Sequence, residues 1–157
     1  MNESTIYNFM NMRIETFLQH SPMFAAGRAA RRFDQMATRA LAADELNFLE
    51  GLVLAALFFD EPRPVKPSRL AETFATTRGN ISHCISALEA RGLLQRAIDS
   101  DDARSYLLML RPAGKRCALR VIRAFDHLQS AFEKEVGKTE LASALKLLTR
   151  IELLNIE

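Results

Sequence analysis

The stretch TTRGNISHCISALEARGLLQR (residues 76–96) decides the fold of this chain. It opens with hydroxyl groups, a cation, a glycine and an asparagine, and then becomes regularly apolar until Gly92 interrupts it. The regular part predicts a helix over residues 78–91, and no acid stands in its first two turns. An ordinary surface helix favours the reverse, because the partial positive charge at its N-terminus attracts Asp and Glu. The absence of acids therefore indicates that this end of the helix contacts a partner that negative charge would repel.

The helix expected over residues 78–91 has two contrasting faces at about 100° per residue. One side is apolar and predicts a core-facing stripe: Ile81, Cys84, Ile85 and Leu88. The opposite side is small, neutral or weakly basic: Gly79, Ser82, His83, Ser86, Ala87 and Ala90. Thr77 is the expected N-cap, and Arg78 and Asn80 flank the leading edge of the outward side.

Such an outward face fits the major groove of DNA. The groove is about 12 Å wide and admits a helix whose contact face is not bulky, and phosphates repel carboxylates. Arg78 can fork onto guanine and Asn80 onto adenine, while Gly79 lets the backbone N–H groups approach a phosphate closely. Hydroxyl groups suited to phosphate or base-edge contacts are those of Thr77, Ser82 and Ser86. A small outward face also suits packing against another helix, and the residues leave that alternative open.

The segment before this helix predicts the other half of a helix-turn-helix. An apolar helix is expected over about 45–59, with Asp44 as its cap. The prolines of DEPRPVKP (residues 60–67) end it, because proline cannot continue a helix. Ser68 is then expected to cap the short helix SRLAETFA.

The segment after the helix predicts a hairpin. Gly92 stands where a left-handed residue ends a helix. LLQRAI (93–98) and SYLLML (105–110) have strand patterns, and the polar DSDDAR (99–104) joins them. A helix-turn-helix followed by such a hairpin is a winged helix.

Apolar helical segments flank this unit on both sides. They are residues 5–19, a helix starting at Ser21-Pro22, a long helix from Pro112 to about Val136, and residues 140–154. These flanks are too apolar for a lone small domain, and a dimer interface is the simplest use for them. The expected fold is mainly α with a small β-hairpin wing: a winged helix-turn-helix domain (62–111) between N-terminal (1–60) and C-terminal (112–157) dimerisation helices.

The charge is unevenly distributed along the 157 residues, although the net charge is only +2. Ten Lys and Arg but five acids stand between Pro62 and Arg116, a net charge of +5, whereas the remainder carries −3. A basic middle between mildly acidic ends indicates a local contact with a polyanion. A solvated surface of mixed charge would give the same count, so the pattern is only supporting evidence.

Several protein classes are not expected. The apolar run LVLAALFF (52–59) is far shorter than the roughly 20 residues of a membrane helix, and the start MNESTIYNFM has no secretory pattern, so a cytoplasmic protein with no membrane contact is expected. Cys84 and Cys117 make neither a disulfide framework nor a zinc pattern. We find no phosphate loop and no catalytic set at motif spacing, with the three histidines scattered, and expect no enzyme, no cofactor and no metal site.

Between Ser68 and Gly114 the sequence resembles the MarR family of bacterial winged helix-turn-helix transcriptional regulators. The matching residues are Leu70-Ala71-Glu72, Thr77-Arg78, Leu88-Glu89, Gly92-Leu93, Arg96, Asp102-Ala103-Arg104, Leu110 and Gly114. The Asp-x-Arg element at 102 and 104 is the most specific of them. The chain departs from the family at Arg111-Pro112, where a threonine is common, and in the extra length before its third helix.

The resemblance implies a triangular homodimer that represses transcription and releases DNA when an effector acts. Each recognition helix would enter a major groove of a roughly palindromic double-stranded site. Arg104, oriented by Asp102, would enter the minor groove, where a narrow groove concentrates negative potential. The candidate DNA-binding residues are Ser68, Thr77, Arg78, Gly79, Asn80, Ser82, His83, Ser86, Asp102 and Arg104.

The resemblance also implies a small effector, often an aromatic or apolar acid, between the dimer body and the winged domain. A few residues of the first 36 form a hypothetical lining, drawn from Met1, Met10, Met12, Met23, Met36, Phe9, Phe17, Phe24 and Phe33. Ordinary core or dimer packing explains most of them better. Two alternatives stay open. One is redox sensing by Cys117, whose pKa nearby Lys115, Arg116 and Arg120 would lower. The other is a protein-interaction module without DNA binding, which would lack steep salt dependence.

Overall fold

The computed structural model describes residues 14–99 and 105–154. Its elements, in chain order, are α2 (Ile14–His20), α3 (Pro22–Ala40), the 3-10 turn η1 (Ala42–Asp44), α4 (Phe48–Phe59), α5 (Pro67–Thr73), α6 (Arg78–Ala90), β1 (Leu94–Ile98), β2 (Tyr106–Leu110), α7 (Pro112–Val136) and α8 (Lys138–Glu152). The mainly helical fold with a two-stranded wing is therefore as predicted. The part of the helix expected over 5–19 that precedes Ile14 lies outside the described residues.

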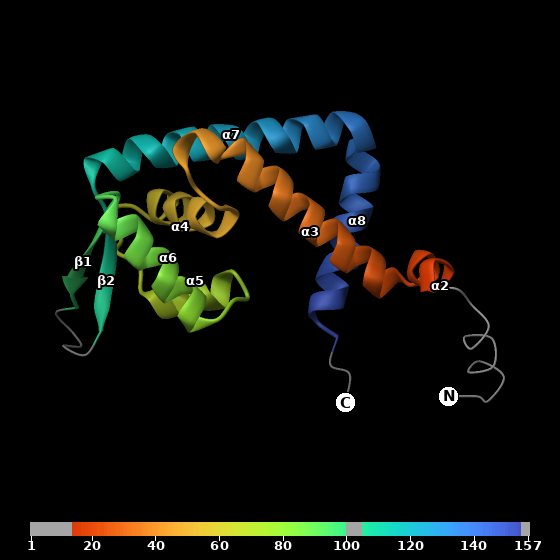
Figure 1. Cartoon of the computed structure of the whole chain (residues 1–157), viewed down its shortest axis with the longest axis horizontal. Helices are drawn as coiled ribbons and strands as arrows, with labels where there is room; N and C mark the ends of the chain where they lie inside the picture. Colours follow the sequence, from red (N-terminus) through yellow and green to blue (C-terminus); the bar gives the residue numbers. More distant parts are fainter. Residues whose placement is uncertain (1–13, 100–104, 155–157) are drawn as a thin grey trace.

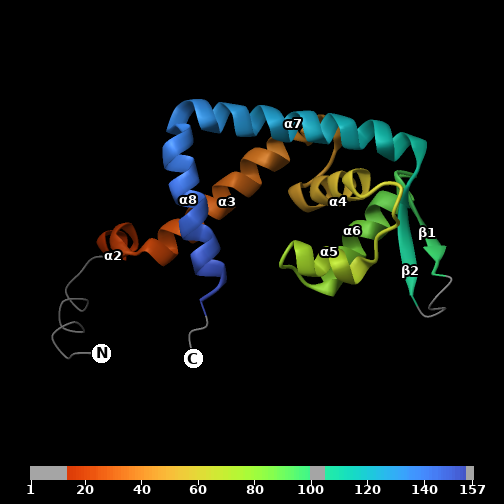
Figure 2. The ribbon, with the colours of Figure 1, turned by 180° about the vertical axis from the view of Figure 1, so that it is seen from behind.

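The molecule has two unlike parts joined by α7 (Figure 1). At one end, α4, α5, α6 and the hairpin pack beneath the first half of α7, and we call this part the winged lobe. At the other end, α2, α3 and α8 project from the second half of α7, and we call them the arms. The view from behind shows the same separation, with the lobe and the arms meeting along α7 and the upper end of α3 (Figure 2).

The core lies almost wholly in the winged lobe. The apolar helix α4 occupies its centre, and Val53 and Leu54 are fully buried there. The predicted inner stripe of α6 is also buried, with Ile81, Ile85 and Leu88 at 0% exposure. The beginning of α7 closes the lobe so tightly that a Cβ on Gly114 would lie 1.8 Å from the carbonyl oxygen of Leu93.

The wing is an antiparallel pair whose register runs from Leu94 opposite Leu110 to Ile98 opposite Tyr106. A third strand-like contact was not predicted: Val65 and Leu108 pair, with the N–H of Leu108 donating to the carbonyl of Val65 at 2.9 Å. The proline-rich linker thus continues as a short edge of the wing and attaches it to the base of α5.

The helix ends are partly as predicted. Thr77 caps α6, since its Oγ1 accepts from the N–H of Asn80 at 3.1 Å, and Gly92 follows the helix with a left-handed φ of 68°. The prediction for Asp44 was wrong. Asn47 caps α4, in a reciprocal capping box with Glu50, because the Asp44 carboxylate is bonded to Arg120 instead.

The predicted start of α5 was also wrong. Lys66 occupies the N-cap position and Pro67 the first turn, so Ser68 is already inside the helix. Proline suits this position because its fixed φ is compatible with the helix and its missing N–H would have had no partner there.

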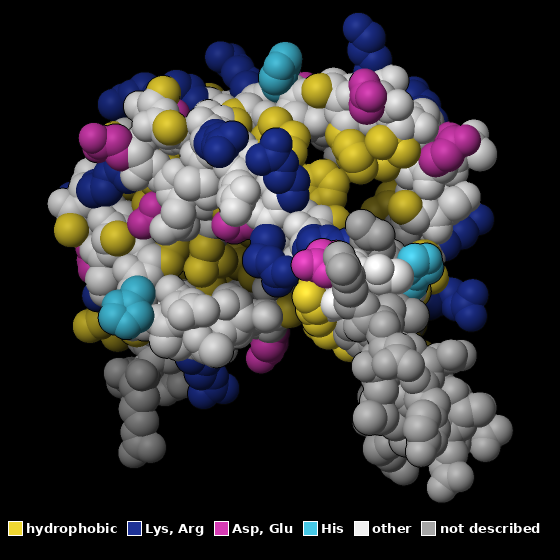
Figure 3. Space-filling view, turned by 45° about the vertical axis from the view of Figure 1, so that its right-hand side comes forward, with side chains coloured by type: hydrophobic (Ala, Val, Ile, Leu, Met, Phe, Trp, Pro, Cys, Tyr) yellow, Lys and Arg dark blue, Asp and Glu magenta, His cyan; other side chains and the backbone are white. Residues whose placement is uncertain are grey.

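The arms have almost no buried side chains. Ala37 is the buried residue of α3, and α8 has none. Large apolar side chains on both helices are strongly exposed, including Met23 at 73%, Leu145 at 63% and Leu148 at 48%. Figure 3 shows apolar side chains lining the hollow between the arms. Within the described ranges, no helix has the length and apolarity needed to span a membrane.

Candidate nucleic-acid interface

The outward face of α6 is exposed as predicted. The residues of this face are all exposed: Gly79, Ser82, His83, Ser86, Ala87 and Ala90. Arg78 is exposed at the first position of the helix, and no acid occurs in the first turn. A Cβ on Gly79 would meet nothing closer than Thr77 Oγ1 at 3.8 Å, so the space above it is open. A flat and acid-free helix start of this kind leaves its backbone N–H groups accessible to an anion.

The side chain of Asn80 is held at the leading edge of α6. Its Nδ2 donates to Thr76 Oγ1 at 3.1 Å, while its backbone N–H binds the capping hydroxyl of Thr77. One amide donor is therefore engaged within the protein, and the amide oxygen points elsewhere. The amide nitrogen carries a second N–H group, so reading an adenine with both atoms of the amide, as the sequence suggested, does not require this internal hydrogen bond to break.

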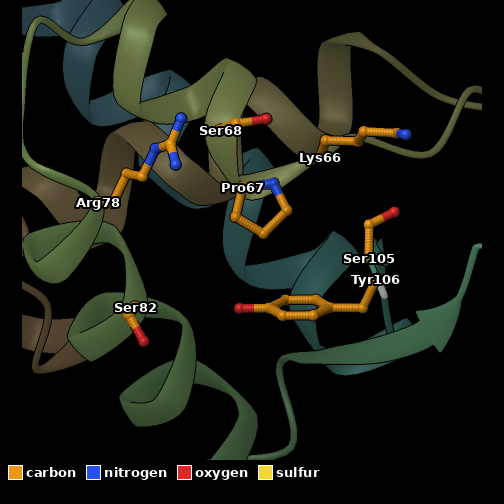
Figure 4. Close-up of a pocket in the computed structure, with 7 residues that line it drawn as sticks. All are labelled: Lys66, Pro67, Ser68, Arg78, Ser82, Ser105 and Tyr106. Carbon is orange, nitrogen blue, oxygen red and sulfur yellow. The ribbon is translucent and has the colours of Figure 1, made fainter. Parts of the chain in front are cut away.

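A cleft of about 480 Å³ lies between α5, α6 and the start of β2. Its lining is formed by Lys66, Pro67, Ser68, Arg78, Ser82, Ser105 and Tyr106 (Figure 4). Arg78 and Lys66 lie at opposite ends, and the side chain of Tyr106 points from β2 toward Ser82 on α6. The described residues that line the cleft supply two cations and several hydroxyl groups and include no carboxylate, which is the donor set that a phosphate backbone needs.

The predicted site residues divide between two sides of α6. Ser68, Arg78 and Ser82 line the cleft beside the wing. Asn80 and His83 line a second, shallower hollow of about 350 Å³ beside α4, where Glu50 contributes an acid. These two sides of α6 would face the walls of a groove that held the helix. Among the described lining residues, a carboxylate occurs on the α4 side and none on the wing side.

The root of the wing is fixed by a buried acid. Asp99 is 5% exposed, and its Oδ2 lies 2.7 Å from Lys66 Nζ and 2.9 Å from Ser105 Oγ, which donates to it. This contact joins the ends of both strands to the start of α5. The two wing candidates, Asp102 and Arg104, lie outside the described residues, so their expected roles stay predictions.

A second charged cluster joins the wing to α6. Arg96 on β1 pairs with Glu89 at 2.9 Å, donates to Ser86 Oγ at 3.0 Å, and stacks over the ring of Tyr106 with its Cζ 5.1 Å from the centroid. Glu89 is the one acid in the sequence of α6. Arg96 neutralises it in place, so α6 presents no unpaired acid to a polyanion.

Sequence reasoning missed Lys66 and Tyr106, and it used Arg96 only as part of the resemblance. Lys66 stands immediately before the proline that starts α5, a position where a side chain projects beside the helix start, and this was a usable signal. The position of Tyr106 depends on the register of the hairpin, which places it opposite Ile98. The spacing of residues alone gives no such register.

The expectation that nearby cations lower the pKa of Cys117 was wrong. The thiol is 2% exposed, and burial raises its pKa, with the Asp44 carboxylate as the next cause. Burial also raises the pKa of Cys84 to about 12, assisted by Glu50. Both thiols therefore stay protonated at neutral pH, and a protonated thiol is a poor nucleophile toward oxidants.

The comparisons with known proteins point to transcriptional regulators. No family model matches the chain. It is 28% identical over 120 residues to the HTH-type transcriptional regulator PrsX of Escherichia coli, and the match covers 76% of this chain and 70% of PrsX. A solved probable transcriptional regulator from Pseudomonas aeruginosa is 25% identical, with a TM-score of 0.74 and coverage of 85% of this chain and 98% of that one.

Two further solved structures share the fold at lower identity. The MepR–DNA complex of S. aureus has a TM-score of 0.77 at 18% identity, covering 83% of this chain and 96% of that one. MarR from E. coli, in its apo form, has a TM-score of 0.67 at 16% identity, with coverage of 83% and 96%. The chain therefore has the winged-helix fold of these regulators, as its resemblance to the MarR family implied.

Proposed function

We propose that this chain is a sequence-specific double-stranded-DNA-binding transcriptional regulator that acts as a homodimeric repressor. The observation that carries the proposal is the outward face of α6, which is exposed, small and acid-free, beside a cleft lined by Arg78 and several hydroxyl groups. Excluding carboxylates from the start of α6 forgoes the stabilisation that acids give at a helix N-terminus. It raises the affinity for a polyanion, because phosphates repel carboxylates. MepR, which shares the fold, is described bound to DNA.

The homodimer follows from the arms. Exposed apolar side chains on α3 and α8 have no cover within one described chain, among them Leu145, Leu147 and Leu148 at 63%, 58% and 48% exposure. Burying such side chains stabilises by about 1.5–3 kcal/mol each. A second copy supplies the same surface by two-fold symmetry, and it sets the two α6 helices against a roughly palindromic site.

Release by an effector is supported by a cavity between the lobe and the arms. It has about 160 Å³ and is lined mainly by apolar side chains of α3, α4 and α7: Phe33, Met36, Ala37, Phe48, Phe125, Leu128, Gln129 and Phe132. Phe33 and Phe132 meet edge to face with centroids 5.1 Å apart. An aromatic ligand that separates this pair would move α3 against α7, and with them the lobe against the arms.

This cavity includes only part of the lining that the sequence suggested. Phe33 and Met36 line it, whereas Met23 and Phe24 lie farther along α3 at 73% and 38% exposure. The remaining candidates are Met1, Met10, Met12 and Phe9, which lie outside the described residues, and Phe17, whose side chain is not described.

DNA binding is tested with the purified full chain, the DNA upstream of its own gene and a random duplex, at about 50 and 200 mM salt. We expect selective binding that weakens steeply with salt. Arg78→Ala should weaken it at least about tenfold, the loss of one good base or phosphate contact, while Arg123→Ala on the far helix α7 should change it little. If no preference is seen, the protein is freed of bound ligand and tested against a random-sequence DNA library. Failure to select a sequence there, or binding that does not depend on salt, would overturn the proposal.

The effector cavity is tested by filling it. Met36→Trp should occupy the space beside Phe33, so that a panel of aromatic carboxylic acids, including benzoate and cinnamate, no longer releases the DNA. Met23→Trp, on an exposed part of the same helix, is the matched control and should leave release unchanged. Equal responses of both variants to an acid that releases the original protein would place the effector elsewhere.

A further inference from the structure

Three separate elements of the fold meet at the side chain and backbone of Asp44. It ends the 3-10 turn η1 between α3 and α4, and its side chain is 18% exposed. The residues that reach it are Arg120 and Cys117 from α7 and Arg91 from the end of α6. We call these four residues the Asp44 junction.

The Asp44 carboxylate fastens η1 to α7. Arg120 Nε donates to Oδ1 at 2.9 Å, and its Nη2 donates to the same oxygen. The buried thiol of Cys117 lies 3.7 Å from that oxygen and donates to it. Arg120, by its hydrogen bond, holds the pKa of Asp44 below its usual value, so the carboxylate is charged at all ordinary pH values.

The backbone of the same turn fastens η1 to the recognition helix. Arg91, directly after the last residue of α6, donates from Nη1 to the carbonyl of Glu45 at 2.9 Å and from Nη2 to the carbonyl of Asp44. Glu45 has a left-handed φ of 53°, a conformation that non-glycine residues seldom adopt. This conformation is part of the turn whose two successive carbonyls bind the single guanidinium of Arg91.

We infer that Asp44 is a positioning residue that sets the angle of α6 relative to the arms, and thereby the half-site spacing that the dimer accepts. The inference rests on the proposed function, because it concerns DNA with two half-sites. Asp44 itself is far from the outward face of α6 and is expected to touch no DNA.

A small rotation at the Asp44 junction would displace the far end of α6 by several times as much as its near end. The junction holds the C-terminal end of α6, whereas the cap and Arg78 are at the other end, about 20 Å away for a helix of 13 residues. A rotation of about 10° at the junction would therefore move the leading edge by about 3 Å. One base pair of B-DNA rises about 3.4 Å, so such a rotation in each copy changes the preferred spacing by a base pair or more.

The test compares Asp44→Asn and Arg120→Gln with the matched control Asp126→Asn, an exposed acid on α7. Binding is measured to a series of duplexes whose half-sites are moved apart or together by one and two base pairs. We expect the original chain and Asp126→Asn to share one sharp optimum. Both junction variants should show an optimum that is moved or broadened, with about tenfold weaker binding at the original spacing.

Two readouts separate positioning from a general loss of structure. The salt dependence of binding, measured at each variant's own best spacing, should stay unchanged because the phosphate contacts are the same. Helix content by circular dichroism should also stay unchanged. A junction variant that is folded and keeps the original sharp optimum would overturn the inference.

A third readout needs neither DNA nor a dimer interface. Spin labels at Ala30→Cys on α3 and Ser82→Cys on α6 report the distance between arm and recognition helix, with labelled chains diluted into unlabelled ones. In Asp44→Asn we expect a broader or displaced distance distribution, and an unchanged one would overturn the inference. If the distribution changes but the original chain binds no DNA at all, the proposed function fails and the positioning role of Asp44 stands.

Discussion

The winged lobe and the arms use the same kinds of apolar residues to opposite effect. In the lobe, Val53, Leu54 and Ile85 are 0% exposed, and the partners that cover them come from the same chain. In the arms, Leu145, Leu147 and Leu148 are 63%, 58% and 48% exposed. One chain therefore covers the apolar side chains of the lobe, whereas it leaves those of the arms exposed.

This difference teaches that a helix's sequence pattern does not say where its apolar face will be covered. Both α6 and α8 carry an apolar stripe at helical spacing. The stripe of α6 is buried against α4 and the wing, whereas α8 has no buried residue. Changes in the lobe should therefore act on one chain, and changes in the arms should act on assembly.

The largest effect is expected from Gly114→Ala, which attacks the lobe alone. The new Cβ would lie 1.8 Å from the carbonyl oxygen of Leu93, so the backbone of α7 or of the wing base must move. We expect a loss of about 4 kcal/mol or more in the free energy of unfolding, measured by denaturant titration. Gly79→Ala is the control, since its Cβ meets open space, and it should change stability by no more than about 1 kcal/mol. Equal stabilities of the two variants would contradict the tight closure of the lobe.

A smaller effect on the lobe but a large one on assembly is expected from Leu148→Asp in α8. The substitution places a charge in the surface that a second copy would cover, in both copies at once. The dimer dissociation constant should rise about 100-fold or more, as measured by sedimentation, while the helix content of the lobe persists. Lys146→Asp, at an exposed position about opposite Leu148 on the same helix, should leave the dimer intact. A Leu148→Asp protein that stays dimeric would show that the arms associate through another face.

Arg96→Gln, on the surface of the lobe, is expected to weaken DNA binding about tenfold. The substitution leaves Glu89 unpaired on the recognition helix, where it repels phosphate. The double variant Arg96→Gln with Glu89→Gln should recover most of the affinity, because both charges are gone. If the double variant binds as weakly as the single one, Arg96 contacts DNA directly rather than neutralising Glu89.

The smallest effect is expected from thiol reagents on the native protein. Cys84 and Cys117 are buried with raised pKa values, so N-ethylmaleimide at pH 8 should leave both unmodified by mass spectrometry until the lobe unfolds. Below the ordinary thiol pKa of about 8.5, both the folded and the unfolded chain hold the thiol proton, and the stability is fully present. Above it only the unfolded chain loses the proton, so the free energy of unfolding falls as the pH rises toward the folded pKa, about 12 for Cys84. Rapid labelling of Cys117 in folded protein would revive the redox alternative.

The local parts of the fold could be predicted because their causes are local. Thr77 caps α6 through a residue three positions away, and Gly92 ends it through its own backbone. Asp44 looked like a cap for the same kind of reason, but Arg120, 76 residues along the chain, binds its carboxylate. A partner so distant in sequence leaves no local signal.

The candidate site divides in the same way. The outward face of α6 followed from helical periodicity, and the structure exposes every residue predicted there. The cleft beside it could not be predicted, since it depends on how the start of α5 and the beginning of β2 approach α6. The sign of the pKa shift of Cys117 was missed because the neighbouring cations in sequence say nothing of its burial or of Asp44.

The continuity of α7 gives the protein a property that neither part has by itself. One helix of 25 residues contributes Gly114, Cys117, Ala118 and Val121 to the lobe core and then continues into the arms. Helix formation is cooperative along its length, so whatever stabilises the far half also opposes unfolding of the near half. In the proposed dimer, association and folding of the lobe are then thermodynamically linked, and the melting temperature of the lobe should rise with protein concentration.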